Sequence, residues 1–428
     1  MVVKYAGYIG RLFSFRRLEP RHWIWIFGFV FIIHIPAVLN YHANENLYCV
    51  MARSFLHGRL SIPDNALAKM PGTDLKNDGD MITYNGKFYS AYPPAPALLL
   101  LPFIFFFGSA NPILIAVLLT CLNIFLIYSI LSRLKISEFL FPWLIYGFVF
   151  GTGYWYVVLT SHHMYGFAQV VSVTSIFLFL NELFGKKRSW LLGLFLGISF
   201  LCRQFTIVLT IFGVGYLIHH YLMYSGIRDV KIFRRKIIIF CSIIGLSAAV
   251  FAVYNYARFG SPIDMGYKYM NYIGIYKVRV EEYGVFSVHY VLVNLYNYLL
   301  KGFNIEFTGP GLMNIQGMDS FGSAILIASP FLVASFKSGW DWWLRLFAWV
   351  VIGVVFTGLL FYHSNGKNQV NTSRYVLDFL PIMFVLTALG ADKIPKWLFK
   401  SLVIYAIAIN IVGFIIHFKF HTLQRFSI

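Results

Sequence analysis

Long apolar stretches alternate with short polar ones along most of the chain. About eleven of these stretches approach or exceed the roughly 20 apolar residues that a membrane-crossing helix needs. They lie near 23–40, 112–131, 139–158, 164–183, 189–202, 204–220, 237–257, 322–336, 346–362, 375–390 and 398–418. Two longer polar segments interrupt the pattern, at about 41–111 and 258–321. The pattern predicts an all-α fold, a polytopic bundle of transmembrane helices with two long loops, built as one domain over residues 1–428.

The apolar run 95–107 is expected not to cross the membrane. It is shorter than a full crossing and contains Pro96 and Pro102, which favours a tilted or re-entrant helix on the outer surface. With the basic N-terminal tail in the cytoplasm, the later Lys/Arg clusters then also fall on the cytoplasmic side. This topology places both long loops outside. The sequence favours a bacterial inner membrane, so that side is the periplasm.

Composition agrees with a membrane protein. The chain is 59% hydrophobic and only 12% charged, whereas soluble domains are about a quarter charged. Topology and anionic lipid account for the net charge of +18, so nucleic acid is not an expected partner. The four cysteines are scattered and show neither a disulfide framework nor metal-ligand spacing. No cofactor is required by the sequence, although the acidic first loop could hold a divalent cation.

The first loop carries two local signals. Asn44 as N-cap and Glu45 in the first turn predict a short amphipathic helix, with its apolar stripe on the outer membrane surface. Asn85–Gly86 between two tyrosine-containing pairs predicts a tight hairpin turn that presents Lys87.

Four segments together resemble a known family. They read NENLYCVMARSFLHGRL, then YNGKFYSAYPPAPALLLLPF shortly after an acid, then RFGSPIDMGY and SRYVLDFLP. This pattern resembles bacterial GT-C-type membrane glycosyltransferases, close to the branch related to the dolichyl-phosphate-mannose–protein mannosyltransferase family. The resemblance implies a polyprenyl-phosphate sugar donor, transfer on the extracytoplasmic side, and an acid in the first external loop as general base. Many relatives carry Asp just after the first span, whereas this chain has Asn44-Glu45-Asn46, so the base is either Glu45 or Asp80.

Glycosyl transfer from a lipid phosphate needs a base for the acceptor hydroxyl and cations for the leaving phosphate. For the base, the alternatives are that Glu45 only stabilises a helix start and that Asp80 is a turn residue or a partner of Lys87. For the phosphate, the candidates are Lys87, Arg203 and Arg374. Each candidate has an alternative interpretation. Lys87 could be a solvated loop residue, Arg203 could snorkel to the membrane interface, and Arg374 could pair with Asp378.

A sugar also needs a binding surface. The candidates are Tyr89 and Tyr92, which could stack on a sugar ring, and His162 and His163, which could hydrogen-bond to sugar or phosphate. In a chain this aromatic, packing and the membrane interface explain tyrosines equally well.

The sequence therefore predicts an inverting glycosyltransferase that acts on a glycan, lipid or protein acceptor of the cell envelope. The alternatives are a GT-C-like polysaccharide polymerase or ligase, and a transporter or flippase of lipid-linked sugars. Internal repeats, which many transporters carry, are not visible in the sequence.

Overall fold

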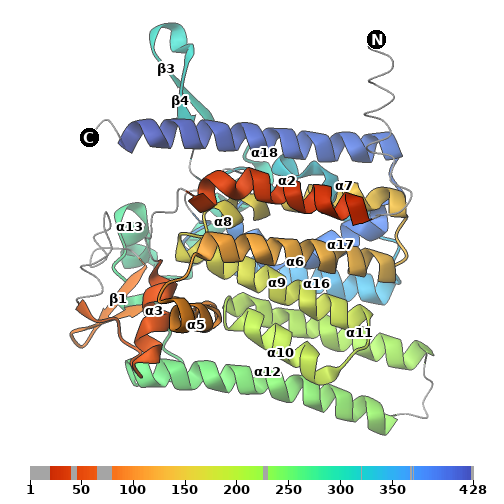
Figure 1. Ribbon diagram of the computed structural model, residues 1–428, viewed down its shortest axis with the longest axis horizontal. Helices are drawn as coiled ribbons and strands as arrows, with labels where there is room; N and C mark the ends of the chain where they lie inside the picture. Colours follow the sequence, from red (N-terminus) through yellow and green to blue (C-terminus); the bar gives the residue numbers. More distant parts are fainter. Residues whose placement is uncertain are drawn as a thin grey trace.

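The computed structural model describes residues 20–39, 46–64, 80–224, 230–319, 321–366, 369 and 371–425. Most of these residues form helices that run side by side in one bundle (Figure 1). The only sheets among them are two hairpins, β1 (Met81–Tyr84) with β2 (Lys87–Ser90) and β3 (Ile305–Thr308) with β4 (Asn314–Met318). The predicted all-α class is confirmed.

Five of the described helices are long and apolar enough to cross a membrane. They are α6 (Pro112–Arg133), α9 (Met164–Phe184), α12 (Val230–Phe259), α16 (Trp342–Leu360) and most of α18 (Lys396–Arg425). The other helices of the bundle are α2 (Pro20–Leu39), α7 (Phe141–Phe150), α8 (Tyr154–Leu159), α10 (Ser189–Phe200), α11 (Leu209–Tyr224), α15 (Ile325–Ala328) and α17 (Leu380–Ala391). The predicted number of about eleven crossings stays a prediction.

Several predicted stretches are broken rather than continuous. The stretch 139–158 divides into α7 and α8 at Gly151–Gly153, and three other stretches contain a 3₁₀ segment. These segments are η3 (Gln204–Val208) before α11, η9 (Pro330–Lys337) after α15, and η10 (Arg374–Asp378) before α17. Breaks of this kind free backbone groups inside a bundle, so they are tolerated only where the surrounding protein satisfies them.

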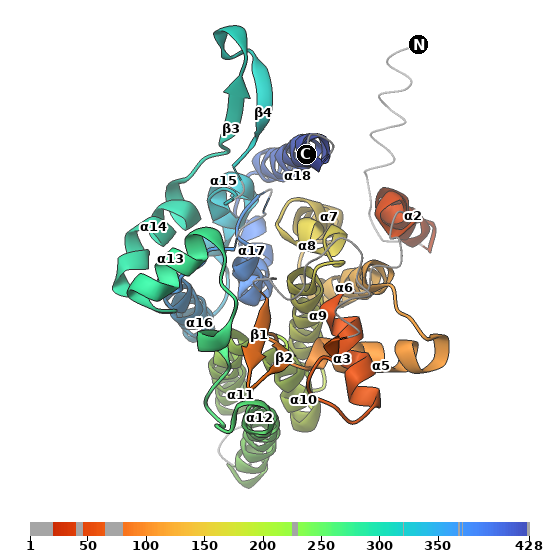
Figure 2. The same ribbon diagram turned by 90° about the vertical axis from the view of Figure 1, so that its left-hand side faces the viewer.

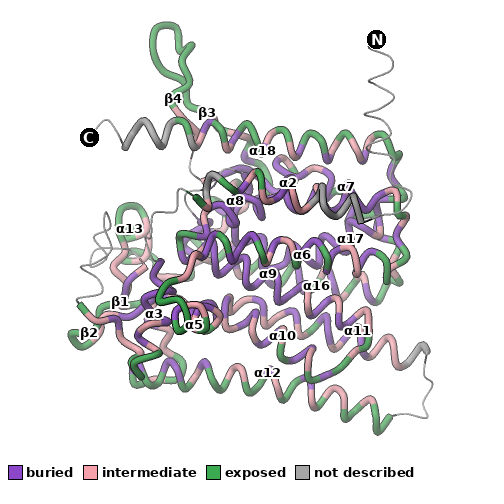
Figure 3. The backbone as a smooth tube through the Cα atoms, viewed as in Figure 1, coloured by how far each residue is buried: buried purple, intermediate pink, exposed green. Residues whose placement is uncertain are grey.

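Burial separates the centre of the bundle from its rim. In α9, 83% of the most apolar stretch is buried, because α6 and α10 pack on it, whereas the corresponding figure for α12 is 22%. Figure 3 shows the same contrast between the buried middle of the bundle and the exposed faces of α12 and α18. The exposed apolar faces suit contact with lipid tails.

The first long loop and the first part of the second gather at one end of the bundle, whereas the hairpin β3–β4 of the second loop projects past α18 (Figure 1). The hairpin β1–β2, α3 (Leu47–Leu56), α5 (Ala95–Phe107) and α13 (Gly274–Tyr283) lie together at the left of Figure 1. The turn between α9 and α10 and the starts of α12 and α18, which carry predicted basic clusters, lie at the opposite end. The arrangement separates the two sets of loops as the topology requires, while the side of the membrane that each faces stays a prediction.

The structure agrees with the prediction for one of the two short helices of the first loop, α5, but not with the prediction for the other, α3. Helix α5 lies across the end of the bundle in Figure 2, as expected for a helix that does not cross. The prediction for α3 as a surface helix capped by Asn44 is wrong. Its N-cap is Asn46, whose side chain accepts a hydrogen bond from the Cys49 amide, and α3 is buried around most of its circumference because α5 packs on it. Glu45 lies outside the described residues.

Two glycines allow neighbouring helices to pack closely. A Cβ atom at Gly193 of α10 would lie 2.8 Å from the Cβ of Ile243 on α12, so the two backbones can approach only because that atom is absent. Gly151 of α7 faces Ala406 of α18 in the same way.

We expect Gly193→Leu to destabilise the fold by about 1–3 kcal/mol, because the new side chain has to displace α12. The measurement is the thermal unfolding midpoint of the purified protein in detergent. Gly245→Leu on α12 is the matched control, since no atom lies within 4 Å of a Cβ placed there. Equal midpoints for the two variants would contradict the packing described here.

Candidate active site

The hairpin β1–β2 brings Asp80 and Tyr92 together at its base. Its tight turn is as predicted, with positive φ angles of 50° at Asn85 and 70° at Gly86, and it pairs Met81 with Ser90. One step beyond that pair, the Ala91 amide donates to the Asp80 carbonyl over 3.2 Å. The Tyr92 hydroxyl donates to Oδ1 of Asp80 over 3.1 Å. The hairpin therefore fixes the position of a carboxylate at the loop end of the bundle.

Two tyrosines surround this carboxylate. Tyr92 and Tyr48 of α3 pack edge to face, with ring centroids 6.2 Å apart. Burial raises the pKa of Tyr92 well above its ordinary value, and the Asp80 carboxylate raises it further, while Arg374 opposes the shift. Tyr92 therefore keeps its proton and acts as the donor toward Asp80. Tyr48 likewise lies within electrostatic range of both Asp80 and Arg203.

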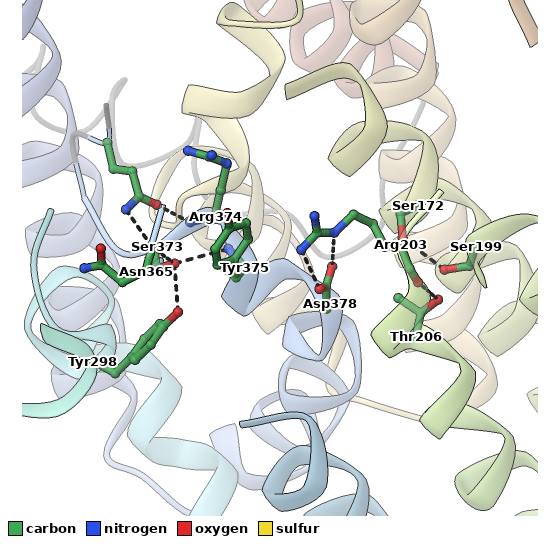
Figure 4. Close-up of polar contacts among 11 residues, drawn as sticks. Ser172, Ser199, Arg203, Thr206, Tyr298, Asn365, Ser373, Arg374, Tyr375 and Asp378 are labelled. Carbon is green, nitrogen blue, oxygen red and sulfur yellow. Dashed lines mark hydrogen bonds and ion pairs between the residues drawn. The ribbon is translucent and has the colours of Figure 1, made fainter. Parts of the chain in front are cut away.

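Arg203 and Asp378 form a buried, bidentate ion pair (Figure 4). Nε of Arg203 donates to Oδ1 of Asp378 over 3.1 Å, and Nη2 donates to Oδ2 over 3.0 Å. The side chain of Arg203 points into the bundle, so the snorkelling alternative is wrong. The alternative pairing of Arg374 with Asp378 is also wrong. A 3₁₀ helix has three residues per turn, and the four-residue offset along η10 places these side chains on different sides.

Arg374 lies among aromatic rings. The centre of its guanidinium is 4.1 Å from the ring centroid of Tyr165 and 5.1 Å from that of Tyr375. Arg203 lies 4.9 Å from the same Tyr375 ring, so this ring contacts both cations. On the other side, His163 stacks on Tyr165 with ring centroids 5.1 Å apart.

The structure brings together only some of the predicted site residues. Tyr92 interacts electrostatically with Asp80 and Arg374, and Tyr48 interacts with Asp80 and Arg203. The ring of Tyr165 contacts both Arg374 and His163. Lys87 and Tyr89 lie elsewhere, because Lys87 is exposed at the hairpin turn and Tyr89 is buried against Phe259. His162 and His163 are both exposed, and their ring centroids are 4.1 Å apart.

Asn46, the neighbour of Glu45 in the chain, is the N-cap of α3. Its side-chain Nδ2 donates to the Ser161 carbonyl over 3.2 Å and so ties the start of α3 to the turn that carries His162 and His163. The choice between Glu45 and Asp80 as base is therefore a matter for experiment.

Arg258 is a buried cation that the sequence analysis missed. It donates to the Ser90 carbonyl and to Oδ1 of Asn255, each over 2.8 Å, and lies 3.8 Å from the ring centroid of Tyr254. No ion pair with a described carboxylate holds it. Its role in the fold is to fasten strand β2 to the outer end of α12. The available signal was an arginine between aromatic residues at the end of an apolar stretch.

Other missed residues are the tyrosines at positions 48, 165 and 375. Nothing in the sequence distinguishes them from tyrosines of the membrane interface. Among the described residues, no three His, Cys, Asp or Glu side chains gather as a metal site would require. Whether the protein needs a divalent cation stays a prediction.

The assembled group has a clear chemical character. The Arg203–Asp378 pair is neutral overall, and Arg374 and Asp80 add a cation and an anion to the described part of this end of the bundle. A guanidinium can hold phosphate oxygens through paired hydrogen bonds, and a carboxylate can accept a proton.

Comparison with known proteins returns two solved structures. No family model matches the chain, and no curated protein matches it. The chain is similar to ArnT from Cupriavidus metallidurans bound to undecaprenyl phosphate, with 12% identity and a TM-score of 0.49 over 90% of this chain and 63% of ArnT. The apo form of ArnT gives 10% identity and a TM-score of 0.46 over 89% of this chain and 62% of that one. This chain spans less than two-thirds of ArnT, and its site is interpreted from its own residues.

The loop between α16 and η10 contains a buried histidine, His363. Arg279 donates to its carbonyl over 2.9 Å, and the rings of Tyr272 and Tyr276 stand edge-on to its ring at 5.3 and 5.7 Å. Burial lowers the pKa of His363 to about 4.

We expect this histidine to make the fold sensitive to acid. The unfolded chain takes up a proton near pH 6.5 and the folded one only near pH 4, so stability falls as the pH drops through this window. At pH 5 the loss is about 2 kcal/mol. Thermal unfolding of wild type and His363→Gln at pH 7 and pH 5 measures it. A variant whose midpoint falls as much as the wild type's would contradict the assignment.

Proposed function

We propose that this protein is an inverting glycosyltransferase that moves a sugar from a polyprenyl-phosphate-linked donor to a cell-envelope acceptor. The observation that carries the proposal is that Asp80 and Arg374 both act electrostatically on the partly buried Tyr92, at the loop end of an apolar helix bundle. A lipid phosphate has an apolar tail and an anionic head. It therefore suits a site whose cation lies where the apolar bundle ends.

In the proposed reaction, a loop carboxylate removes the proton from the acceptor hydroxyl. The hydroxyl oxygen attacks the anomeric carbon from the face opposite the phosphate, and the bond between that carbon and the phosphate oxygen breaks. The phosphate leaves with the electron pair, and Arg374 stabilises its added negative charge. Asp80 has a fixed position for the role of base, and Glu45 is the other candidate.

The donor class and the side of the membrane come from the resemblance in sequence. A bacterial inner membrane with the site facing the periplasm is consistent with the separation of basic clusters from the long loops. The acceptor class is a glycan, lipid or protein of the envelope.

The test is a mass-spectrometric transfer assay with protein in nanodiscs, supplied with polyprenyl-phosphate sugars and an envelope lipid extract. We expect Asp80→Asn or Glu45→Gln to lower turnover by about 10²–10⁴-fold, as expected for removal of a general base. Glu281→Gln, an exposed acid of the second loop, is the control and should retain full activity. Thermal unfolding of each variant shows that it remains folded.

Two outcomes would contradict the proposal. If both isosteric variants keep wild-type turnover, a loop carboxylate is not the base. If the wild type consumes no donor but moves labelled lipid between leaflets, the protein is a flippase.

A further inference from the structure

A cluster of buried polar side chains lies directly beside Arg374. Its members are Ser323, His363, Asn365, Asn371 and Thr372, each at most 5% exposed. Each has one side-chain polar atom that is buried and makes no hydrogen bond to any other residue: Oγ of Ser323, Nδ1 of His363, Oδ1 of Asn365 and Asn371, and Oγ1 of Thr372. We call this set the polar cluster.

Two backbone segments hold the polar cluster together. Phe321 and Gln369 pair as a β-bridge, and the Ser323 amide donates to the Asn371 carbonyl over 2.6 Å. Across the same junction, Nδ2 of Asn365 donates to the Phe321 carbonyl over 3.5 Å. The cluster is thus a defined structure at the loop end of the bundle.

The cluster is also joined to Arg374. The Gln369 side chain accepts a hydrogen bond from the Arg374 amide, and the Ser373 hydroxyl donates to the Asn365 carbonyl over 2.5 Å (Figure 4). The guanidinium of Arg374 lies against the same segment, since a Cβ atom placed at Gly366 would be 3.1 Å from its Nη1. A phosphate held by Arg374 would therefore lie beside the loop that carries the cluster.

Unpaired buried polar atoms are rare, because each loses its hydrogen bonds to water on folding without replacement. Native proteins contain only a few per 100 residues. Of twenty such atoms among the described residues, four lie on residues between positions 363 and 372, and a fifth lies on Ser323, which is paired to that segment through its backbone. Such a concentration is typical of a site that is optimised for a ligand rather than for stability.

We propose that the polar cluster binds the sugar of the lipid-linked donor and that this sugar is a neutral one. The inference rests on the proposed function. Sugar hydroxyls both donate and accept, so they match a mixture of hydroxyl, amide oxygen and imidazole nitrogen. The five side chains of the cluster include no carboxylate, lysine or arginine, and Arg374 beside them holds the phosphate in the proposed function. A charged substituent on the sugar would therefore have no partner of opposite charge among the five.

The test uses substitutions that remove only the unpaired hydroxyls. Ser323→Ala and Thr372→Val keep the volume of the side chain nearly unchanged. Ser335→Ala in η9 is the matched control, because Oγ of Ser335 is equally buried and equally without a hydrogen bond. Two quantities are measured in detergent: the thermal midpoint of the ligand-free protein, and the affinity for lipids by native mass spectrometry.

The lipid probes are undecaprenyl phosphate alone and undecaprenyl phosphate carrying glucose, mannose or galactose. We expect all three variants to match or exceed the wild-type midpoint, since an unpaired buried group is removed in each. We expect Ser323→Ala and Thr372→Val each to weaken binding of the preferred sugar lipid about threefold to tenfold, as loss of one hydrogen bond does. Binding of undecaprenyl phosphate alone should not change, and Ser335→Ala should bind both lipids as the wild type does.

Three results would overturn the inference. Unchanged affinity for every sugar lipid in both cluster variants would show that these hydroxyls do not contact the sugar. Equal weakening for both kinds of lipid would show that the residues act on the phosphate or on the fold. A wild type that binds undecaprenyl phosphate but none of the neutral sugar lipids would leave the proposed function intact and refute the sugar assignment. A wild type that binds no lipid phosphate at all would refute the proposed function itself.

Discussion

The buried ion pair between Arg203 and Asp378 is the constraint on which the loop end of the bundle depends. Removing two charges from water is costly unless the two neutralise each other in good geometry. Arg203 and Asp378 meet this condition with two hydrogen bonds. Removal of one partner from a buried pair of this kind typically costs about 3–5 kcal/mol. The pair joins η3 to η10, two segments 175 positions apart in the chain. Its formation therefore fixes the place of the residues next to Asp378 along η10.

The consequence for the site is a division of roles between two arginines. Arg203 is neutralised by Asp378, whereas Arg374, at the start of the same 3₁₀ segment, lies among the rings of Tyr165 and Tyr375. The opposite side of the site is fixed by a different cation, because Arg258 fastens the strand that leads to Tyr92 and Asp80. The proposed base and the proposed phosphate ligand are thus held by separate structural elements that meet at Tyr92.

Local and periodic features of this fold were predictable from the sequence. Apolar stretches predicted the helices, and the Asn85–Gly86 pair predicted the first hairpin. Each of these depends on residues that are near one another in the chain. The failures involve contacts between distant segments. The partner of Asp378 lies 175 positions away, and α3 is buried because α5, from beyond the hairpin, covers its second side. Asn44 and Asn46 are equally good caps by residue type, so only the packing of α3 distinguishes them.

The central claim is that Arg374 holds the phosphate of a lipid-linked sugar, and its most direct test is binding of undecaprenyl phosphate to wild type and Arg374→Gln. Native mass spectrometry in detergent measures the affinity, and Arg235→Gln, an exposed arginine at the opposite end of the bundle, controls for loss of charge. The account predicts that Arg374→Gln weakens binding at least about tenfold, as loss of a charge-assisted hydrogen bond does, while Arg235→Gln binds as the wild type does. Equal affinity in all three proteins would contradict it.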